Sequence, residues 1–219
     1  MASSLGLFWD VRVAILRGLG ETLLLTLAAQ GLALILAVPT AVARMSNRRW
    51  LTRASGAYVE LTRGTPALVQ VFWIYYCVPI FTGFQWSPLA GAIVALGLNV
   101  GAYDAETFRA GIQSVHRGQT LAARALGMSG FTTFREIVLP QATRYVLPSL
   151  LNNFIGLLLF TSIASTIGVQ ELTRVAGMLN AATYKGVVVF SGIAMIYLCS
   201  SLLTSFGVRR LEFFYARRD

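Results

Sequence analysis

The chain has 219 residues, of which 56% are hydrophobic and only 12% are charged, and its net charge is +9. Soluble globular domains carry about 25% charged residues, so the composition excludes an ordinary soluble domain. Asp, Glu, Lys and Arg are absent from residues 22–43, 64–103, 145–170 and 186–208. A helix needs about 20 apolar residues to cross a bilayer, and lipid offers backbone groups no partner outside a helix. The sequence therefore predicts an all-α membrane protein.

The predicted elements begin with an N-terminal segment, residues 1–20, in which we expect a short helix over residues 4–16 in the outer membrane interface. A single transmembrane domain follows, residues 21–210, and residues 211–219 form a cytoplasmic tail. Pro79, Gly83 and Pro88 supply a turn inside the second uncharged stretch, which therefore holds two spans. We predict about five spans in all, at residues 23–43, 67–80, 89–108, 146–166 and 187–206.

The basic residues form three clusters, which follow the first span, separate the third span from the fourth, and end the chain. They are Arg44, Arg48, Arg49 and Arg53; Arg109, Arg117, Arg124, Arg135 and Arg144; and Arg209, Arg210, Arg217 and Arg218. Five spans place all three clusters on one side, and Lys and Arg gather on the cytoplasmic side of membranes. We therefore expect the N-terminus outside and the C-terminus in the cytoplasm. The charge has a topological role, and we expect no nucleic-acid partner.

The sequence offers no catalytic or metal-binding constellation. It has no Gly-x-x-x-x-Gly-Lys-Ser/Thr loop for nucleotide phosphates, and its only lysine is Lys185. His116 has no second His or Cys near it, and Cys77 and Cys199 are isolated in predicted spans. We expect no metal ion, no cofactor and no enzymatic reaction in this chain. These features are typical of a solute transporter, whose energy must come from a partner or from an ion gradient.

Residues 109–144 form the longest segment predicted on the cytoplasmic side. Residues 119–126 are predicted to form a short helix with small alanines at positions 122, 123 and 125, which Gly127 ends in a left-handed cap. A second amphipathic stretch, residues 131–139, leads to Pro140. Two interpretations stay open on physical grounds: an ordinary re-entry of the chain into the membrane, or a compact helix that inserts into the groove of a partner.

This segment resembles the cytoplasmic EAA loop in permease subunits of ABC importers, specifically their polar-amino-acid uptake branch. The likeness in the loop is carried by Ala122-Ala123, by Gly127 and by Ile137-Val138-Leu139-Pro140. Further blocks follow in order along the chain: Glu60-Leu61-Thr62-Arg63-Gly64-Thr65-Pro66, Val69-Gln70, Ala102-Tyr103, Ala105-Glu106, Phe108-Arg109-Ala110-Gly111-Ile112, Gly118-Gln119, Pro140-Gln141-Ala142, Thr161-Ser162, Glu171-Leu172 and Arg209-Arg210-Leu211-Glu212. The resemblance implies a type-1 ABC-transporter transmembrane domain. It also implies a coupling helix, with Ala122, Ala123, Arg124, Leu126 and Gly127, that docks on an ATP-hydrolysing subunit.

Two positions depart from the family pattern. Leu121 stands where the family has an acidic residue at the start of the EAA block, so we expect the contact with the ATPase to depend on shape and apolar burial. Leu159-Phe160 stands where the branch has a Lys-Asp pair in the fourth span, which removes a partner for a charged substrate. The second departure suggests that this chain is one half of a heterodimer whose sister subunit holds the main substrate site.

Polar side chains within the spans are candidates for the translocation path. Transporters place their substrates near the membrane midplane, and the residues that we expect to face the path are Asn99, Thr161, Ser162 and Ser165. The alternative is hydrogen bonding between helices, which contributes about 0.6 kcal/mol per pair in membranes. The same two interpretations apply to Gln30, Gln70, Asn152 and Asn153.

Charged residues lie at the inner ends of two predicted spans. Tyr103, Glu106 and Arg109 follow one another at intervals of three residues, and Glu60 and Arg63 have the same spacing. Each set is either an interfacial ion pair of little net value or a gate or brace for the coupling loop. The acids cluster at the ends of the spans.

These features predict the permease subunit of an ATP-driven ABC importer in a bacterial inner membrane. It forms half of a translocation pore for a polar amino acid or similar small solute and works by alternating access. The implied partners are a second permease chain, with a heterodimer favoured, two ATP-binding subunits that hold ATP and Mg, an extracytoplasmic solute-binding protein, and membrane lipid. The alternative is an ion-gradient-driven secondary transporter or channel, which predicts buried acids in the middle of spans.

Overall fold

Helices and their connections make up the whole of the described chain. The computed structural model describes residues 4–216 and, within them, the side chains of residues 11–207. The α-helices are α1 (Ser4–Arg44), α2 (Arg49–Arg63), α3 (Ala67–Phe72), α4 (Val78–Thr82), α5 (Pro88–Ser114), α6 (Arg117–Ala125), α7 (Gly130–Thr133), α8 (Leu139–Phe160), α9 (Leu172–Thr183) and α10 (Gly186–Ala216). Two π-helices, η1 (Trp73–Cys77) and η2 (Phe134–Val138), and a 3₁₀-helix, η3 (Thr161–Ile167), join some of them. The predicted all-α fold is confirmed.

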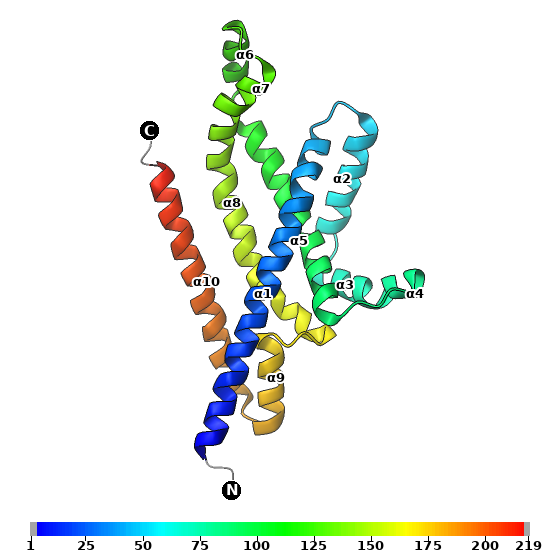
Figure 1. Cartoon of the computed structure of the whole chain (residues 1–219), viewed down its shortest axis with the longest axis vertical. Helices are drawn as coiled ribbons and strands as arrows, with labels where there is room; N and C mark the ends of the chain where they lie inside the picture. The colour runs from blue at the N-terminus through cyan, green and yellow to red at the C-terminus, as the bar shows by residue number, and fades with distance from the viewer. Residues whose placement is uncertain (1–3, 217–219) are drawn as a thin grey trace.

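The long helices run roughly along one axis of the molecule (Figure 1). The short helices α6 and α7 lie at one end of this axis, and α9 and the N-terminus lie at the other. The turn between α1 and α2 and the C-terminus both lie toward the end that carries α6. Four helical segments are long and apolar enough to cross a membrane, and the bent pair of α2 with the segment α3–η1–α4 is a fifth candidate.

The second span differs most from the prediction of one helix over residues 67–80. The structure adds α2, for which no helix was predicted, and the chain bends by 107° between α2 and the run from Ala67 to Thr82. The charges of α2 hide it from a search for apolar stretches, although its buried residues Gly56 and Val59 give it one packed face. Pro66 then stands in an extended conformation just before α3 and separates the two helices.

Both π-helices come just before a proline. η1 ends at Cys77, two residues before Pro79, and η2 ends at Val138, two residues before Pro140. A proline has no N–H to donate, and its ring clashes with the carbonyl four residues earlier in an α-helix. A π-turn inserts one extra residue and relieves that clash. The helical run from Gly130 to Ile167 therefore continues past Pro140 as a single candidate span of 38 residues.

The other spans are longer than their predictions. α5, α8 and α10 extend beyond the predicted limits 89–108, 146–166 and 187–206 at one end or both, and α9 is an element that the sequence analysis does not predict. The helix expected over residues 4–16 is continuous with the first span, because α1 runs without a break from Ser4 to Arg44. Ile15 and Leu19 of this end of α1 pack against buried Leu172 and Ala176 of α9. Residues 1–3 and 217–219, at the ends of the predicted terminal segments, lie outside the described residues.

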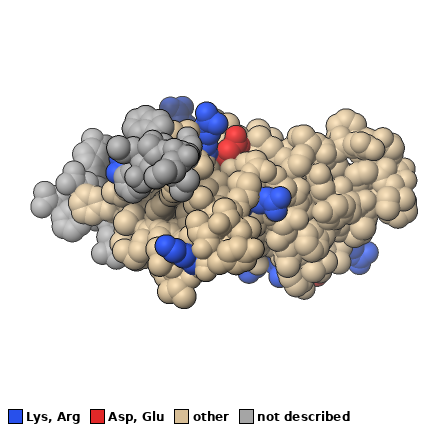
Figure 2. Space-filling view, turned by 90° about the horizontal axis from the view of Figure 1, so that it is seen from below, with Lys and Arg blue, Asp and Glu red and all other residues tan. Residues whose placement is uncertain are grey.

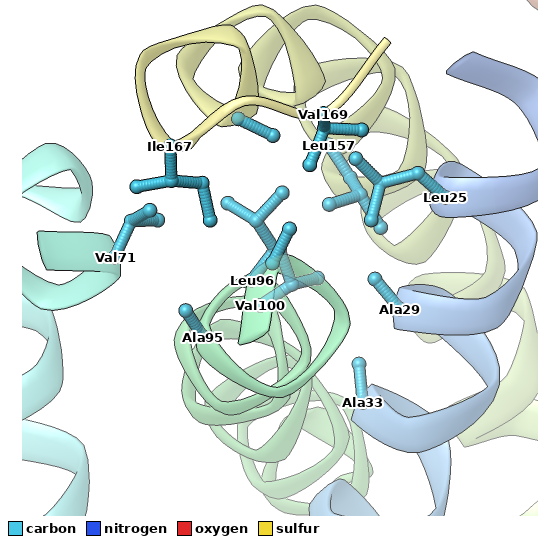
Figure 3. Packing of buried hydrophobic residues seen from close by; sticks show 12 residues of the cluster. Leu25, Ala29, Ala33, Val71, Ala95, Leu96, Val100, Leu157, Ile167 and Val169 are labelled. Carbon is cyan, nitrogen blue, oxygen red and sulfur yellow. The ribbon is translucent and has the colours of Figure 1, made fainter. Parts of the chain in front are cut away.

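The core lies where α1, α3, α5, the end of α8 and η3 meet (Figure 3). On α1, every fourth residue from Leu25 to Ala41 is buried, and four of these five are alanines. Glycines of α5 face this stripe: a Cβ at Gly97 would lie 2.8 Å from a methyl of Leu32, and one at Gly101 would lie 3.2 Å from the carbonyl oxygen of Ala33. Small residues of this kind let membrane helices approach closely, so that dispersion contacts can hold them together.

The outer face of α10 has the opposite character. Only 6% of its most apolar stretch is buried inside the chain, and Leu202, Leu203 and Phe206 are each more than half exposed. Lipid tails suit such a face, since they are as apolar as leucine. Seen from the N-terminal end of the molecule, uncharged side chains cover most of the visible surface, and basic groups are scattered singly (Figure 2).

The close contact between α1 and α5 leads to a stability prediction. We expect Gly101→Leu to destabilise the protein by about 1–3 kcal/mol, the usual cost of overpacking, because the new side chain meets the backbone of α1. Gly31→Leu on α1 is the matched control, since a Cβ there has nothing within 4 Å. Thermal unfolding in detergent should show a lower Tm for Gly101→Leu alone. Equal Tm values for both variants would contradict this account of the packing.

Candidate functional site

The loop between α5 and α8 presents a short helix at the end of the molecule (Figure 1). This helix, α6, spans Arg117–Ala125, against a predicted range of 119–126, and Nδ1 of His116 accepts a hydrogen bond from the Gly118 N–H at its start. Gly127 has φ +77°, as the predicted left-handed cap requires. The N–H of Met128 donates to the Ala123 carbonyl at 3.1 Å and that of Gly127 to Arg124 at 3.0 Å. This pair of bonds forms a Schellman motif, so the predicted end of the helix is observed.

The outer surface of this loop is apolar with basic groups among the apolar ones. Leu121 is 66% exposed, Leu126 83% and Phe131 74%. Ala122 and Arg124 are also exposed, whereas Ala123 is only 1% exposed and packs inside the loop. Ala123 therefore supports the shape of the loop from within, and the surface available to a partner is formed by the other predicted docking residues together with Leu121.

The predicted path residues lie in two places. Asn99 on α5 is 3% exposed, and its side-chain N–H donates to Oε1 of Gln70 on α3 at 3.0 Å. Gln70 in turn donates to the Thr62 carbonyl at 2.7 Å, across the bend between α2 and α3. Asn99 thus joins α5 to the bend, which is the helix–helix interpretation of this residue, and its place on a path stays a prediction.

Thr161, Ser162 and Ser165 lie on η3, where each hydroxyl donates to the carbonyl three residues earlier, at 2.6–2.7 Å. Residues three apart share a face in a 3₁₀-helix, so the expected common face of Ser162 and Ser165 is observed. Thr161 is fully buried, while the two serines are partly exposed. Among the described side chains, no hydrogen bond links these three residues to Asn99. Their role in a path stays a prediction.

A fully buried carboxylate lies between three helices, and the sequence analysis missed it. Asp104 on α5 is 0% exposed. Its Oδ2 accepts from the side-chain amide of Gln30 on α1 at 2.7 Å, and its Oδ1 accepts from Asn153 on α8 at 2.8 Å. The acids are therefore not confined to the ends of the spans, because Asp104 stands well inside α5. The sequence does contain a signal for this contact, because Gln30, Asp104 and Asn153 are polar residues that lie in three different predicted spans.

The predicted brace at Glu106 and Arg109 includes a third charged residue, Arg44. Glu106 and Arg109 form the expected ion pair, with Arg109 Nε 2.9 Å from a carboxylate oxygen. Arg44, at the end of α1, adds a second contact to Glu106 at 3.5 Å. Its guanidinium lies over Gly56 of α2, where an added Cβ would be only 2.7 Å away. We call Arg44, Glu106 and Arg109 the ionic cluster; it joins α1 to α5 next to α2.

Glu60 and Arg63 do not form the second pair that their spacing suggests. No ion pair between them is present among the described side chains. The Arg63 guanidinium instead lies 5.1 Å from the centre of the Tyr103 ring, in a cation–π contact with α5. Arg63 and Tyr103 therefore join the end of α2 to α5, and Glu60 is exposed.

A second buried acid, Glu171, lies outside the membrane-spanning segments and starts α9. Its carboxylate accepts from the Thr173 and Arg174 N–H groups at 2.9 and 2.8 Å and from the Tyr197 hydroxyl of α10 at 2.6 Å. Burial raises the pKa of Glu171 above its usual value, an effect that the hydrogen bonds from Tyr197 and the backbone oppose. Glu171 therefore caps α9 and fastens it to α10 at the end of the molecule opposite α6.

Comparison with known proteins shows to which family this chain belongs. The sequence pattern of the family described as binding-protein-dependent transport system inner membrane components matches residues 31–215. The chain belongs to this family. It is thus the permease subunit of an ATP-driven ABC importer, a family in which the ATPase and the solute-binding protein are separate partners, and the ion-gradient alternative is set aside.

Individual relatives agree with this assignment. The permease is 38% identical over 205 residues to the octopine transport system permease protein of Rhizobium meliloti, covering 90% of this chain and 84% of that one. It is 34% identical to the glutamine transport system permease protein of Escherichia coli, covering 93% and 94% of the two chains. It is 40% identical to the L-cystine transport system permease protein of Bacillus subtilis, covering 96% and 90%.

Solved structures show the same fold. A crystal structure of an amino acid ABC transporter with histidines superposes with a TM-score of 0.88 at 35% identity, over 94% of this chain and 95% of that chain. An inward-facing structure of a methionine ABC transporter superposes with a TM-score of 0.78 at 19% identity, which supports the fold alone. The predicted type-1 transmembrane domain is confirmed.

The cap of α6, the predicted coupling helix, leads to a docking prediction. We expect Gly127→Ala to reduce the amount of ATPase that co-purifies with the permease, because a Cβ at positive φ costs about 1–2 kcal/mol and disturbs the end of α6. Gly130→Ala is the control, since Gly130 is exposed, has no left-handed backbone and has nothing within 4 Å of a new Cβ. Equal recovery of the ATPase with both variants would contradict a role for the cap in docking.

The buried carboxylate leads to a stability prediction. Asp104→Leu removes the acceptor of the buried Gln30 amide and leaves Asn153 with only its longer bond to the Thr107 hydroxyl, and an unpaired buried group costs about 1–3 kcal/mol. We expect a marked fall in Tm in detergent. Asp104→Asn should lower the Tm much less. The new amide can accept a hydrogen bond from one neighbour through its oxygen and donate one through its nitrogen to the other, once that neighbour's amide has flipped to present its oxygen. A leucine variant as stable as the wild type would show that the network contributes no stability.

Proposed function

We propose that this permease imports a polar amino acid or a similar small solute. The observation that carries the proposal is the agreement with the amino acid ABC transporter, with a TM-score of 0.88 over 94% of this chain. The octopine, glutamine and cystine permeases among its relatives act on amino acids or compounds built from them. The chain itself supplies the route through the membrane, and the family's separate ATPase supplies the energy.

The chain forms half of a pore, together with a second permease chain. Leu159 and Phe160, each 43% exposed, stand where the polar-amino-acid branch has a Lys-Asp pair in the fourth span. An exposed apolar pair offers nothing to a charged substrate and suits packing against another chain. We therefore favour a heterodimer, whose sister subunit carries the charged pair.

The orientation in the membrane follows from the arginines. The turn after α1 and the loop between α5 and α8 carry two of the basic clusters, and both lie toward the end that holds α6 (Figure 1). The positive-inside rule makes this end cytoplasmic. The N-terminus then lies outside, the C-terminus lies in the cytoplasm, and Glu171 and α9 lie on the side from which a binding protein delivers its solute.

The coupling helix docks on the ATPase by apolar contacts. Leu121, Leu126 and Phe131 are exposed enough to be buried by a partner, and Arg124 stands among them. Full burial of a leucine or phenylalanine side chain is worth about 1.5–3 kcal/mol, so these three are sufficient anchors for a specific contact. Two permease chains present two such helices to two ATP-binding subunits, which hold ATP and Mg. Closure of that pair moves the helices and opens the pore to the outside.

Uptake by the reconstituted complex tests this function. The permease is co-expressed with the sister permease, ATPase and binding protein from its own gene neighbourhood and placed in proteoliposomes. We expect ATP-dependent uptake of at least one compound from a panel of polar amino acids. Uptake that needs an ion gradient but no ATP, or uptake of no amino acid in the panel, would contradict the proposal.

The predicted path is tested in the same assay. We expect Asn99→Ala and Ser162→Ala to change the KM or the maximal rate of uptake, with Thr166→Ala on the same 3₁₀ turn as a control. Unchanged kinetics in both variants would show that the path lies elsewhere.

A further inference from the structure

A polar groove lies between α5 and α8, beside the end of α2. It has a volume of about 500 Å³, within the range of about 300–1,000 Å³ that small-molecule sites occupy. We call it the inner groove and define it by Arg63, Tyr103, Glu106, Ser149 and Asn153. It contains none of the predicted path residues and none of the predicted docking residues of α6, but it includes Arg63, Tyr103 and Glu106 of the predicted gate or brace. From Asn153, beside the buried Asp104, it extends along α5 to Ser114, close to the coupling loop.

The side chains of the inner groove do not suit contact with lipid. Tyr103 is 37% exposed and Tyr145 61%, and Arg63 and Ser149 are also exposed, as is Asn152 next to the groove on α8. Tyr103, Ser149 and Asn152 lie within predicted spans. Polar and ionisable groups at this depth face a water-filled cavity or the interior of a bundle, because hydrocarbon offers them no partner. A face that does suit lipid is the leucine-rich side of α10. The inner groove therefore faces an aqueous route.

The charge of the groove favours an anion. Arg63 and Glu106 are the charged residues that line it, and Arg44 and Arg109 lie next to Glu106 without lining the groove. Arg109 and Arg44 both contact Glu106, so its charge is already matched. Arg63 contacts the face of the Tyr103 ring instead, and no carboxylate lies within 4 Å of it among the described side chains. Arg63 is thus a positioned cation at the wall of a polar cavity, near enough to Glu106 to interact with its charge but not in a direct ion pair with it.

We propose that Arg63 binds the α-carboxylate of the transported amino acid in the inner groove, before release to the cytoplasm. This inference rests on the proposed function of the permease. The Tyr103 ring holds the guanidinium in place, and the Ser149 hydroxyl faces the same cavity. The guanidinium fork matches a carboxylate with two parallel hydrogen bonds. The site explains how a chain with Leu159-Phe160 in its fourth span can still contact a charged solute.

Protection of a thiol from labelling tests the site. Ser149→Cys is made in a chain whose Cys77 and Cys199 are replaced by alanine, and the ATP-free complex is labelled with N-ethylmaleimide. The probes are the amino acid of the panel that the wild-type complex imports and its α-carboxamide. We expect the amino acid, but not the carboxamide, to slow labelling. With Arg63→Gln, half-protection should need about tenfold more amino acid, as the loss of one hydrogen bond to a charged group implies.

Two controls keep the outcomes distinct. Arg53→Gln changes an exposed arginine of α2 that does not line the groove, and it should leave protection unchanged. Ala110→Cys, which also lines the groove, replaces Ser149→Cys as the reporter if that variant does not fold. Equal protection by the carboxamide, protection that survives Arg63→Gln, or no protection while the wild type imports the amino acid would overturn the site and leave the proposed function intact. Absence of import by the wild type would overturn both.

Discussion

The close approach of α1 to α5 is the constraint on which the rest of the permease depends. The alanine stripe of α1 and the glycines of α5 let the two helices pack with hardly any side chain between them. That contact fixes α5, and α5 carries one partner in four polar contacts with other helices, through Asn99, Tyr103, Asp104 and Glu106. A shift of α5 against α1 would disturb all four at once.

The interior is organised by polar contacts that compensate one another. Asp104 has two amide donors from two helices, and Glu106 has two arginines. In hydrocarbon an unmatched group of this kind would be costly, so each set specifies how three elements come together. The small-residue contact sets how closely α1 approaches α5, and the two bonds accepted by Asp104 add a specific alignment of α1, α5 and α8.

Much of the fold could be predicted from the sequence, because the spacing of charges outlines spans directly. The cap at Gly127 followed from residue type alone. α2 was missed because its charges interrupt its apolar face, and α9 because a 12-residue helix outside the membrane gives no hydropathy signal. Arg63 was assigned to Glu60 by its spacing along the chain, but the packing of α2 against α5 places the Tyr103 ring against its guanidinium. Contacts between distant segments, such as Arg44 with Glu106 or Gln30 with Asp104, need the packing of whole helices and are invisible to local patterns.

The helical run from Gly130 to Ile167 has a mechanical consequence. Its 38 residues give a length of about 57 Å at 1.5 Å per residue, and it begins beside the coupling helix and ends in the core at η3. It packs against α5 along part of its length, so that contact acts as a fulcrum. On the proposed orientation, a tilt imposed by the ATPase at the α6 end would displace Thr161–Ile167 in the opposite direction.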